Sequence, residues 1–183
     1  MPKKSEIIII TGTPGSGKST VAKELLQRYE FGFHIPIDDL REWVVSGIAH
    51  PLPEWTSETT RQFDLGYQAA AHLAGLYARA GFAVAIDQVI YPGDVRKYFG
   101  SLSSEFTIHK IFLQPNVEVA LERNASRKNK DFDTTFLNEP IQTIYKSLDE
   151  QIQKDSGWII VNSSIQNIKG TVDEIFRKIR GEN

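Results

Sequence analysis

Cysteine is absent from the 183 residues of this chain. Its absence excludes disulfide bonds, thiolate catalysis and zinc sites built on cysteine. Histidine is scarce, and the four histidines show none of the spacings that metal-binding histidines use. His34 falls in a strand pattern and His72 in a helical pattern of small residues, so we interpret both as structural. Of the other two, only His50 is placed where a substrate could reach it.

Long apolar runs and an excess of one charge are also lacking. No run approaches the length of a membrane-spanning helix, and the opening "MPKKSE" has no signal-peptide core. A net charge of −2 gives no general attraction to nucleic acid or membranes. Repeats, linkers and low-complexity tracts are missing too. We therefore expect a single domain over residues 1–183, no membrane partner and a cytoplasmic location, with the oligomeric state left open.

What the chain does contain is an alternation of strand-like and helical patterns. Runs typical of buried strands are "EIIIIT", "FHIPID", "FAVAIDQVI", "TIHKIFL" and "WIIVNS". Helical patterns lie near residues 18–30, 39–46, 58–80, 93–100, 116–128, 138–154 and 167–180. The alternation predicts an α/β fold, a three-layer α/β/α sandwich around a five-stranded parallel sheet. Ligands of such sheets bind beyond the carboxyl ends of the strands, so the candidate site residues are expected there.

Directly after the first strand-like run, "GTPGSGKST" fits the pattern G-x-x-x-x-G-K-[ST] between a strand and a helix. Its glycines let successive N–H groups point at an anion, and the start of the helix adds its dipole. Lys18 can reach the β- and γ-phosphates, Ser19 can ligate Mg²⁺ and Thr20 can hydrogen-bond a phosphate. The stretch therefore predicts binding of ATP and Mg²⁺. Its expected nucleotide-contacting residues are Gly12, Thr13, Pro14, Gly15, Ser16, Gly17, Lys18, Ser19 and Thr20.

Two adjacent carboxylates end the second strand-like run, "FHIPID", and begin the next helical pattern. Asp38 continues the strand and should face the phosphate loop (residues 12–20), where a base could take a proton from an acceptor hydroxyl. Asp39 begins the helix, where aspartate is a favoured cap. We predict that Asp38 is catalytic and binds the acceptor, whereas Asp39 caps the helix. A catalytic role for Asp39 is the alternative.

The third strand-like run ends in Asp87, where an ATP enzyme usually keeps an acidic group for Mg²⁺. We therefore interpret Asp87 as a metal ligand together with Ser19. The next residue is Gln88, where ATP-hydrolysing motor proteins commonly carry a glutamate that activates water. A glutamine can position an acceptor but cannot serve as a base at neutral pH. This pattern favours transfer to an acceptor other than water, with Gln88 in the acceptor site.

A charged stretch, "LERNASRKNKDFD", brings Arg123 and Arg127 onto one helix face if the helix extends that far. A solvated helix end would explain these charges as well. Beside a phosphate loop, however, arginines on a mobile segment can close over a transferring phosphoryl group. We predict a lid near residues 123–135 in which both arginines are catalytic. The guanine-reading pattern N-K-x-D fails at its fourth position in "NKDF", which disfavours a GTP-binding switch protein.

The phosphate loop, "IDDLR" and "RNASRKNKD" together resemble P-loop kinases of the chloramphenicol phosphotransferase-like and polynucleotide-kinase-like group, and more distantly gluconate kinases and zeta toxins. The resemblance covers most of the chain and implies a nucleoside/nucleotide kinase-like P-loop NTPase fold. It implies Asp38 as the base and, by similarity to the phage polynucleotide kinase, Arg41 as a contact to acceptor phosphate. It also places lid arginines at Arg123 and Arg127. Unlike the phage enzyme, this chain has no phosphatase domain and no strongly basic composition.

The helical segment near residues 39–62 differs from that enzyme and should shape the acceptor site. It holds Trp43 and Trp55, which are either core aromatics or walls for an acceptor ring; we place Trp55 in the acceptor site. The sequence as a whole predicts an ATP–Mg²⁺ kinase for a hydroxyl of a small molecule such as an antibiotic, a sugar or a nucleoside. One alternative is a 5′-hydroxyl polynucleotide kinase. Another is a nucleotide-dependent ATPase switch without an acceptor.

Overall fold

The structure, a computed structural model, describes residues 4–52, 54–126 and 137–182. In this part of the chain, five strands form one sheet in the order β2–β3–β1–β4–β5. The strands are β1 (Glu6–Thr11), β2 (Gly32–Pro36), β3 (Ala83–Asp87), β4 (Thr107–Leu113) and β5 (Trp158–Val161). All neighbouring strands run parallel, so their carboxyl ends meet at one edge. The expected α/β fold with a five-stranded parallel sheet is confirmed.

Helices follow the strands as the patterns indicated. They are α1 (Lys18–Leu26), α2 (Ile37–Glu42), α3 (Ser57–Arg79), α4 (Pro92–Asp94), α5 (Val117–Ala125), α6 (Asn138–Ile152) and α7 (Ile168–Arg180). A π-helical turn, η1 (Val95–Phe99), and a 3₁₀ turn, η2 (Gly100–Ser104), continue from α4 where a single helix was expected. None of the helices in the described residues combines the length and apolar character that crossing a membrane requires.

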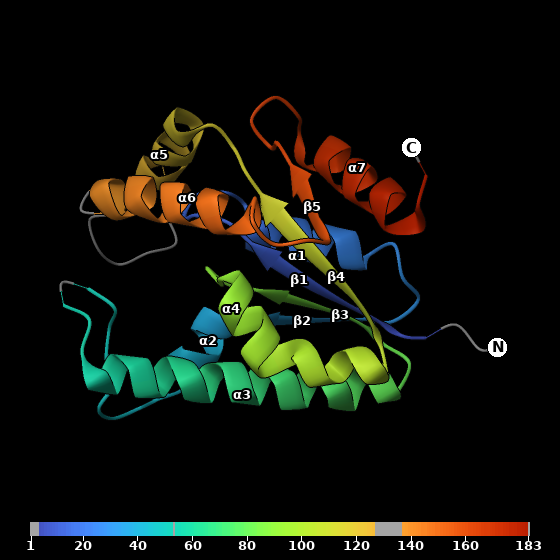
Figure 1. Ribbon diagram of the computed structural model, residues 1–183, viewed down its shortest axis with the longest axis horizontal. Helices are drawn as coiled ribbons and strands as arrows, with labels where there is room; N and C mark the ends of the chain where they lie inside the picture. Colours follow the sequence, from blue (N-terminus) through green and yellow to red (C-terminus); the bar gives the residue numbers. More distant parts are fainter. Residues whose placement is uncertain (1–3, 53, 127–136, 183) are drawn as a thin grey trace.

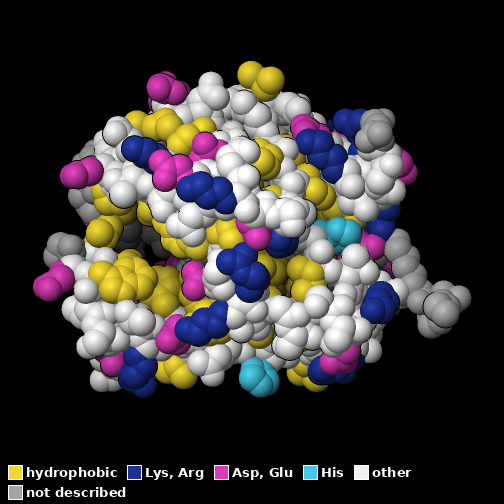
Figure 2. Space-filling view, in the orientation of Figure 1, with side chains coloured by type: hydrophobic (Ala, Val, Ile, Leu, Met, Phe, Trp, Pro, Cys, Tyr) yellow, Lys and Arg dark blue, Asp and Glu magenta, His cyan; other side chains and the backbone are white. Residues whose placement is uncertain are grey.

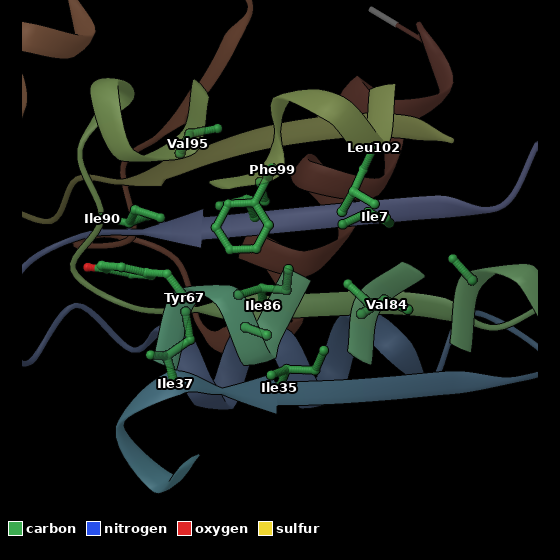
Figure 3. Close-up of a cluster of buried hydrophobic side chains, with 14 of the residues drawn as sticks. Ile7, Ile35, Ile37, Tyr67, Val84, Ile86, Ile90, Val95, Phe99 and Leu102 are labelled. Atoms are coloured by element: carbon green, nitrogen blue, oxygen red, sulfur yellow. The ribbon is translucent and has the colours of Figure 1, made fainter. Parts of the chain in front are cut away.

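Apolar clusters cover both faces of the sheet. The isoleucines of β1 alternate between them because successive side chains of a strand point to opposite faces. Ile7 and Ile9 pack with residues of β2, β3, α3 and η1, and Figure 3 shows these side chains meeting around Phe99. Ile8 and Ile10 pack instead against α1 and α7. The continuous apolar run of β1 is thus explained by a central strand that is buried on both faces.

One boundary differs from the sequence prediction. The second strand was expected to extend to residue 38, but β2 ends at Pro36 and α2 begins at Ile37. Pro36 has φ −77° and ψ 112° and lies at the end of an edge strand, where its missing N–H disrupts little of the ladder. Both aspartates therefore lie in the first turn of α2.

The carboxyl ends of the strands point toward a gap between two groups of helices. Figure 1 shows α2 and the beginning of α3 on one side of these ends and α5 and α6 on the other. In the same orientation, the space-filling view shows a hollow in the surface between the two groups, with apolar side chains below its opening (Figure 2). The strand-end residues singled out in the sequence all lie toward this side of the molecule.

Candidate active site

The phosphate loop, residues 12–20, joins β1 to the first turn of α1. Gly15 has φ 82°, and a Cβ on it would lie 2.4 Å from the carbonyl oxygen of Ala120 in α5. Both its backbone angle and its surroundings therefore require glycine. Gly17, with φ 92°, precedes α1 and provides no side-chain cap. The N-terminus of α1 is thus open to an external acceptor, which is what an anion site at a helix end requires.

Lys18 turns back over this loop. Its Nζ donates hydrogen bonds to the carbonyl oxygens of Gly12 at 2.9 Å and Thr13 at 3.0 Å. The hydroxyls of Thr13 and Ser16 are buried, and neither has a hydrogen-bond partner among the described residues. Leaving buried hydroxyls unpaired costs free energy, and phosphate oxygens of a nucleotide would supply the missing acceptors. The predicted nucleotide residues thus come together around a site with the chemistry of a phosphate cradle.

Asp87, the last residue of β3, lies beside Ser19 at the start of α1. The hydroxyl of Ser19 donates to Oδ1 of Asp87 at 3.0 Å, and Nε2 of His34 lies 2.5 Å from Oδ2. Proteins usually bind Mg²⁺ through one or two carboxylates together with substrate phosphates. This hydroxyl–carboxylate pair beside the phosphate loop fits that arrangement. Within the described residues, no group of three or more acidic or histidine side chains forms a cation site by itself.

Asp38 reaches the same edge of the sheet from α2. The amide Nε2 of Gln88 donates to Oδ1 of Asp38 at 2.9 Å, and Oε1 of Gln88 accepts from the backbone N–H of Val89 at 2.7 Å. Gln88 is buried, whereas Asp38 is exposed and open to a substrate. The strand placement of Asp38 was wrong, because β2 ends two residues earlier. Its predicted position near the strand ends is nevertheless the position that it occupies.

The expectation that Asp39 caps the helix is wrong. The N-cap of α2 is Pro36, and no side chain makes a capping hydrogen bond there. Asp39 lies within the first turn, where its charge interacts favourably with the helix dipole but replaces no cap. Of the two aspartates, Asp38 is the one held by a residue from the end of β3.

Arg41 was expected to contact the acceptor, but the structure packs it into the protein. It is 7% exposed, its guanidinium lies 3.8 Å from the centre of the Phe63 ring, and Nη2 donates to the carbonyl oxygen of Ala49 at 2.6 Å. Burial lowers the pKa of this guanidinium, and the nearby carboxylate of Asp38 opposes that effect. Arg41 therefore anchors the connection between α2 and α3, close to Asp38.

Gln62 of α3 anchors the same connection, a role that no pattern in the sequence indicated. Its side-chain amide donates to the carbonyl oxygen of Gly47 at 2.7 Å, and its Oε1 accepts from the N–H of Ala49 at 2.8 Å. Burial of Gln62 is hard to predict from the sequence, because a glutamine in a helix is usually exposed to solvent. Arg41 and Gln62 together fix the backbone that follows α2.

Trp55 lies at the surface just before α3. It is 55% exposed, donates its indole N–H to Thr60 at 2.7 Å and stacks on Phe63 with ring centres 4.9 Å apart. Trp43 is 73% exposed. The interpretation of these two tryptophans as core aromatics is therefore wrong. An exposed indole supported from behind by another ring is the arrangement that a binding wall requires.

The predicted lid is described only at its beginning. Arg123 lies in α5 and donates from Nη2 to the carbonyl oxygen of Ser163 at 2.9 Å, beyond the end of β5. The hydroxyl of Ser163 in turn donates to the carbonyl oxygen of Ser16 in the phosphate loop at 3.4 Å. α5 ends at Ala125, and Arg127 lies outside the described residues. The structure thus brings Arg123 near the phosphate loop.

Known proteins share the family and the fold of this chain. Residues 7–151 match a family model described as an AAA domain. An ATP-dependent kinase of Vanderwaltozyma polyspora is 39% identical over 56 residues, which cover 30% of this chain and only 16% of that protein. The present chain thus matches a small part of that relative.

Solved structures show the same fold at low sequence identity. A sugar kinase of Janibacter sp. HTCC2649 superposes with a TM-score of 0.66 at 16% identity, covering 96% of this chain and 95% of the other. The APS kinase of Mycobacterium tuberculosis, solved with AMPPNP and APS, gives a TM-score of 0.66 at 16% identity, covering 98% and 99%. Because the family match spans residues 7–151, well over half of the 183 residues, the chain belongs to the AAA-domain family.

Proposed function

We propose that this protein is an ATP–Mg²⁺-dependent kinase that transfers the γ-phosphate to a hydroxyl group of a small molecule. The observation that carries the proposal is the hydrogen bond between Gln88 and Asp38. It holds an exposed carboxylate at the sheet edge that also presents Asp87 and the phosphate loop. A phosphate cradle and a separate carboxylate at one edge are the parts that phosphoryl transfer to an alcohol requires.

On the nucleotide side, the phosphate loop binds the phosphates through its N–H groups and the amine of Lys18. Ser19 and Asp87 would hold Mg²⁺, which neutralises charge on the β- and γ-phosphates when it is bound. Arg123, and Arg127 beyond the described residues, are proposed to add positive charge to the transferring group. The buried hydroxyls of Thr13 and Ser16 support this assignment, since they have no hydrogen-bond partner in the described part of the chain.

On the acceptor side, Asp38 orients the acceptor hydroxyl and takes its proton. The hydroxyl oxygen attacks the γ-phosphorus, the bond from that phosphorus to the β–γ bridging oxygen breaks, and ADP leaves. Because phosphoryl transfer has a loose transition state, orientation of the hydroxyl contributes at least as much as proton removal. Gln88 keeps the carboxylate in place, and the exposed face of Trp55 is proposed to line the acceptor site.

The alternatives have less support. In a 5′-hydroxyl polynucleotide kinase, Arg41 would bind acceptor phosphate, but here this side chain is buried against Phe63 and Ala49. In an ATPase switch, a carboxylate would be expected after Asp87 to activate water, and Gln88 occupies that position. The switch gives no role to the exposed carboxylate that Gln88 holds beside the phosphate loop, whereas a polynucleotide kinase would also use it as a base.

The test is transfer of radiolabelled γ-phosphate from ATP to separate pools of sugars, antibiotics, nucleosides and oligonucleotides, with water alone as the reference. We expect labelled product in one of the small-molecule pools and little ADP formation without an acceptor. Labelling confined to oligonucleotides would favour the polynucleotide kinase. Rapid ADP formation that no acceptor accelerates would favour the switch.

A further inference from the structure

The pairing of β2 with β3 places His34 beside the carboxylate that ends β3. His34 lies opposite Ala85 in the register, and Asp87 is two residues farther along, on the same face of the sheet. Such diagonal neighbours are within reach of a long side chain. Because Ala85 has only a methyl group, the imidazole of His34 can extend over it toward Asp87. This arrangement depends on the strand order and cannot be seen in the sequence alone.

The contact restrains both oxygens of the carboxylate. Nε2 of His34 lies 2.5 Å from Oδ2 of Asp87, while Ser19 donates to Oδ1 at 3.0 Å. The side chains of His34 and Asp87 are 13% and 7% exposed. An ionised carboxylate only accepts hydrogen bonds, so Nε2 carries the proton in this contact. With a donor on each oxygen, the plane of the carboxylate is fixed, and Oδ1 is the oxygen directed toward the start of α1.

We propose that His34 is a positioning residue for the magnesium site. It holds Asp87 in the orientation in which the carboxylate and Ser19 receive the metal together with the nucleotide. The inference rests on the proposed nucleotide site, since Ser19 and Asp87 are its metal-binding pair. Outer-shell partners of this kind commonly change metal affinity by about 10–100-fold when they are removed. The interpretation of His34 as merely structural would then be incomplete.

His34 also stands between Asp87 and the surface. It lines a groove together with Lys23 and Leu26 of α1. A smaller side chain at position 34 would open the carboxylate to water from this groove. Water can replace the hydrogen bond but cannot fix its direction. The expected defect is therefore in the ordering of the metal site rather than in the phosphate loop, because the hydrogen bond of His34 goes to Asp87.

The experiment titrates a fluorescent ATP analogue into the full chain, in EDTA and at a series of Mg²⁺ concentrations. In EDTA, His34→Ala should bind the analogue within about twofold of the parent. The Mg²⁺ concentration that gives half of the Mg²⁺-induced gain in affinity should rise by about 10–100-fold. His34→Gln, which keeps a donor at a similar distance from the backbone, should recover much of the Mg²⁺ response. His72→Ala is the matched control, because His72 is exposed on α3.

Melting temperature in EDTA separates this role from a purely structural one. A His34→Ala variant that melts lower but responds to Mg²⁺ like His72→Ala overturns the proposal. If His34→Ala does not fold, His34→Gln is compared with His34→Asn, whose side chain is too short to reach Asp87. An equal Mg²⁺ response in these two variants overturns the proposal. A nucleotide affinity of the parent protein that does not depend on the Mg²⁺ concentration overturns the proposal as well. A parent that shows the Mg²⁺ response but phosphorylates no acceptor overturns only the kinase assignment.

Discussion

The side-chain amide of Gln88 donates a 2.9 Å hydrogen bond to the carboxylate of Asp38, and so connects the end of β3 to the first turn of α2. Its neighbour Asp87 contacts Ser19 and His34 instead. Two consecutive residues thus serve two groups: Asp87 faces the phosphate loop and Gln88 faces the proposed acceptor site. Successive residues at a strand end point in opposite directions, which makes this division possible.

Replacing Gln88 by glutamate should lower kcat by about 10–100-fold. The substitution keeps the shape but exchanges a donor for an acceptor, so the hydrogen bond to a charged group, commonly about 1.5–3 kcal/mol, is lost. Two carboxylates would then repel each other. The measurement is kcat with the acceptor identified in the transfer screen. Gln68→Glu, at an exposed position of α3, should leave kcat unchanged; equal kcat in Gln88→Glu and the parent would remove Gln88 from the site.

Asp38→Asn should lower kcat by roughly 10²–10⁴-fold with little change in ATP affinity, and the lower figure is expected for a loose transition state. Asp39→Asn should leave kcat near that of the parent and reduce stability by about 0.5 kcal/mol, because only a dipole interaction is lost. Both variants are measured for kcat and melting temperature side by side. Loss of turnover in Asp39→Asn alone would show that the wrong carboxylate has been assigned.

Lys18→Ala should abolish phosphoryl transfer while the protein remains folded. Its amine donates to two carbonyl oxygens of the phosphate loop, and Lys18 does not belong to the buried apolar core. The expected result is an unchanged circular dichroism spectrum together with loss of ATP binding. Lys23→Ala, five residues farther along α1 and exposed, is the control. Undiminished transfer by Lys18→Ala would refute the nucleotide site.

Arg41→Ala should destabilise the protein by about 2–4 kcal/mol, because it removes a buried hydrogen bond and a stacked cation and leaves a cavity. Denaturant unfolding measures this loss of stability, with the exposed Arg61→Ala as the control.

The KM of the parent protein for its acceptor should change little between low and moderate salt, since Arg41 is not available to a phosphate. A steep salt dependence would favour the polynucleotide kinase over the small-molecule kinase.

Much of the fold could be predicted because the apolar residues follow either the periodicity of a strand or that of a helix. β1 and β4 coincide with their apolar runs, and the phosphate loop is defined by its own pattern. The boundary at residues 36–38 was missed because "IPIDD" suits a strand end and a helix start equally well. Only the packing of Ile37 against the α3 face decides it.

The contacts around the site could not be predicted in the same way. Gln88 meets Asp38, and His34 meets Asp87, because β2 is the neighbour of β3, which is a property of the strand order. Arg41 is buried because the segment after α2 folds back to bring Ala49 to it. Such pairings join residues 8 to 53 positions apart. Local patterns identify the residue types that carry chemistry, but not the partners that hold them.

The contact of Gly15 with α5 has a consequence for how mutations in this protein would be detected. Any side chain at Gly15 meets the carbonyl oxygen of Ala120 and an unfavourable backbone angle, so it would lower the amount of folded protein in a cell. A screen that measures abundance would therefore reveal Gly15 without any knowledge of a substrate. Lys18 would pass that screen and be revealed only by growth or turnover. Within one loop, selection for folding and selection for activity act on different residues.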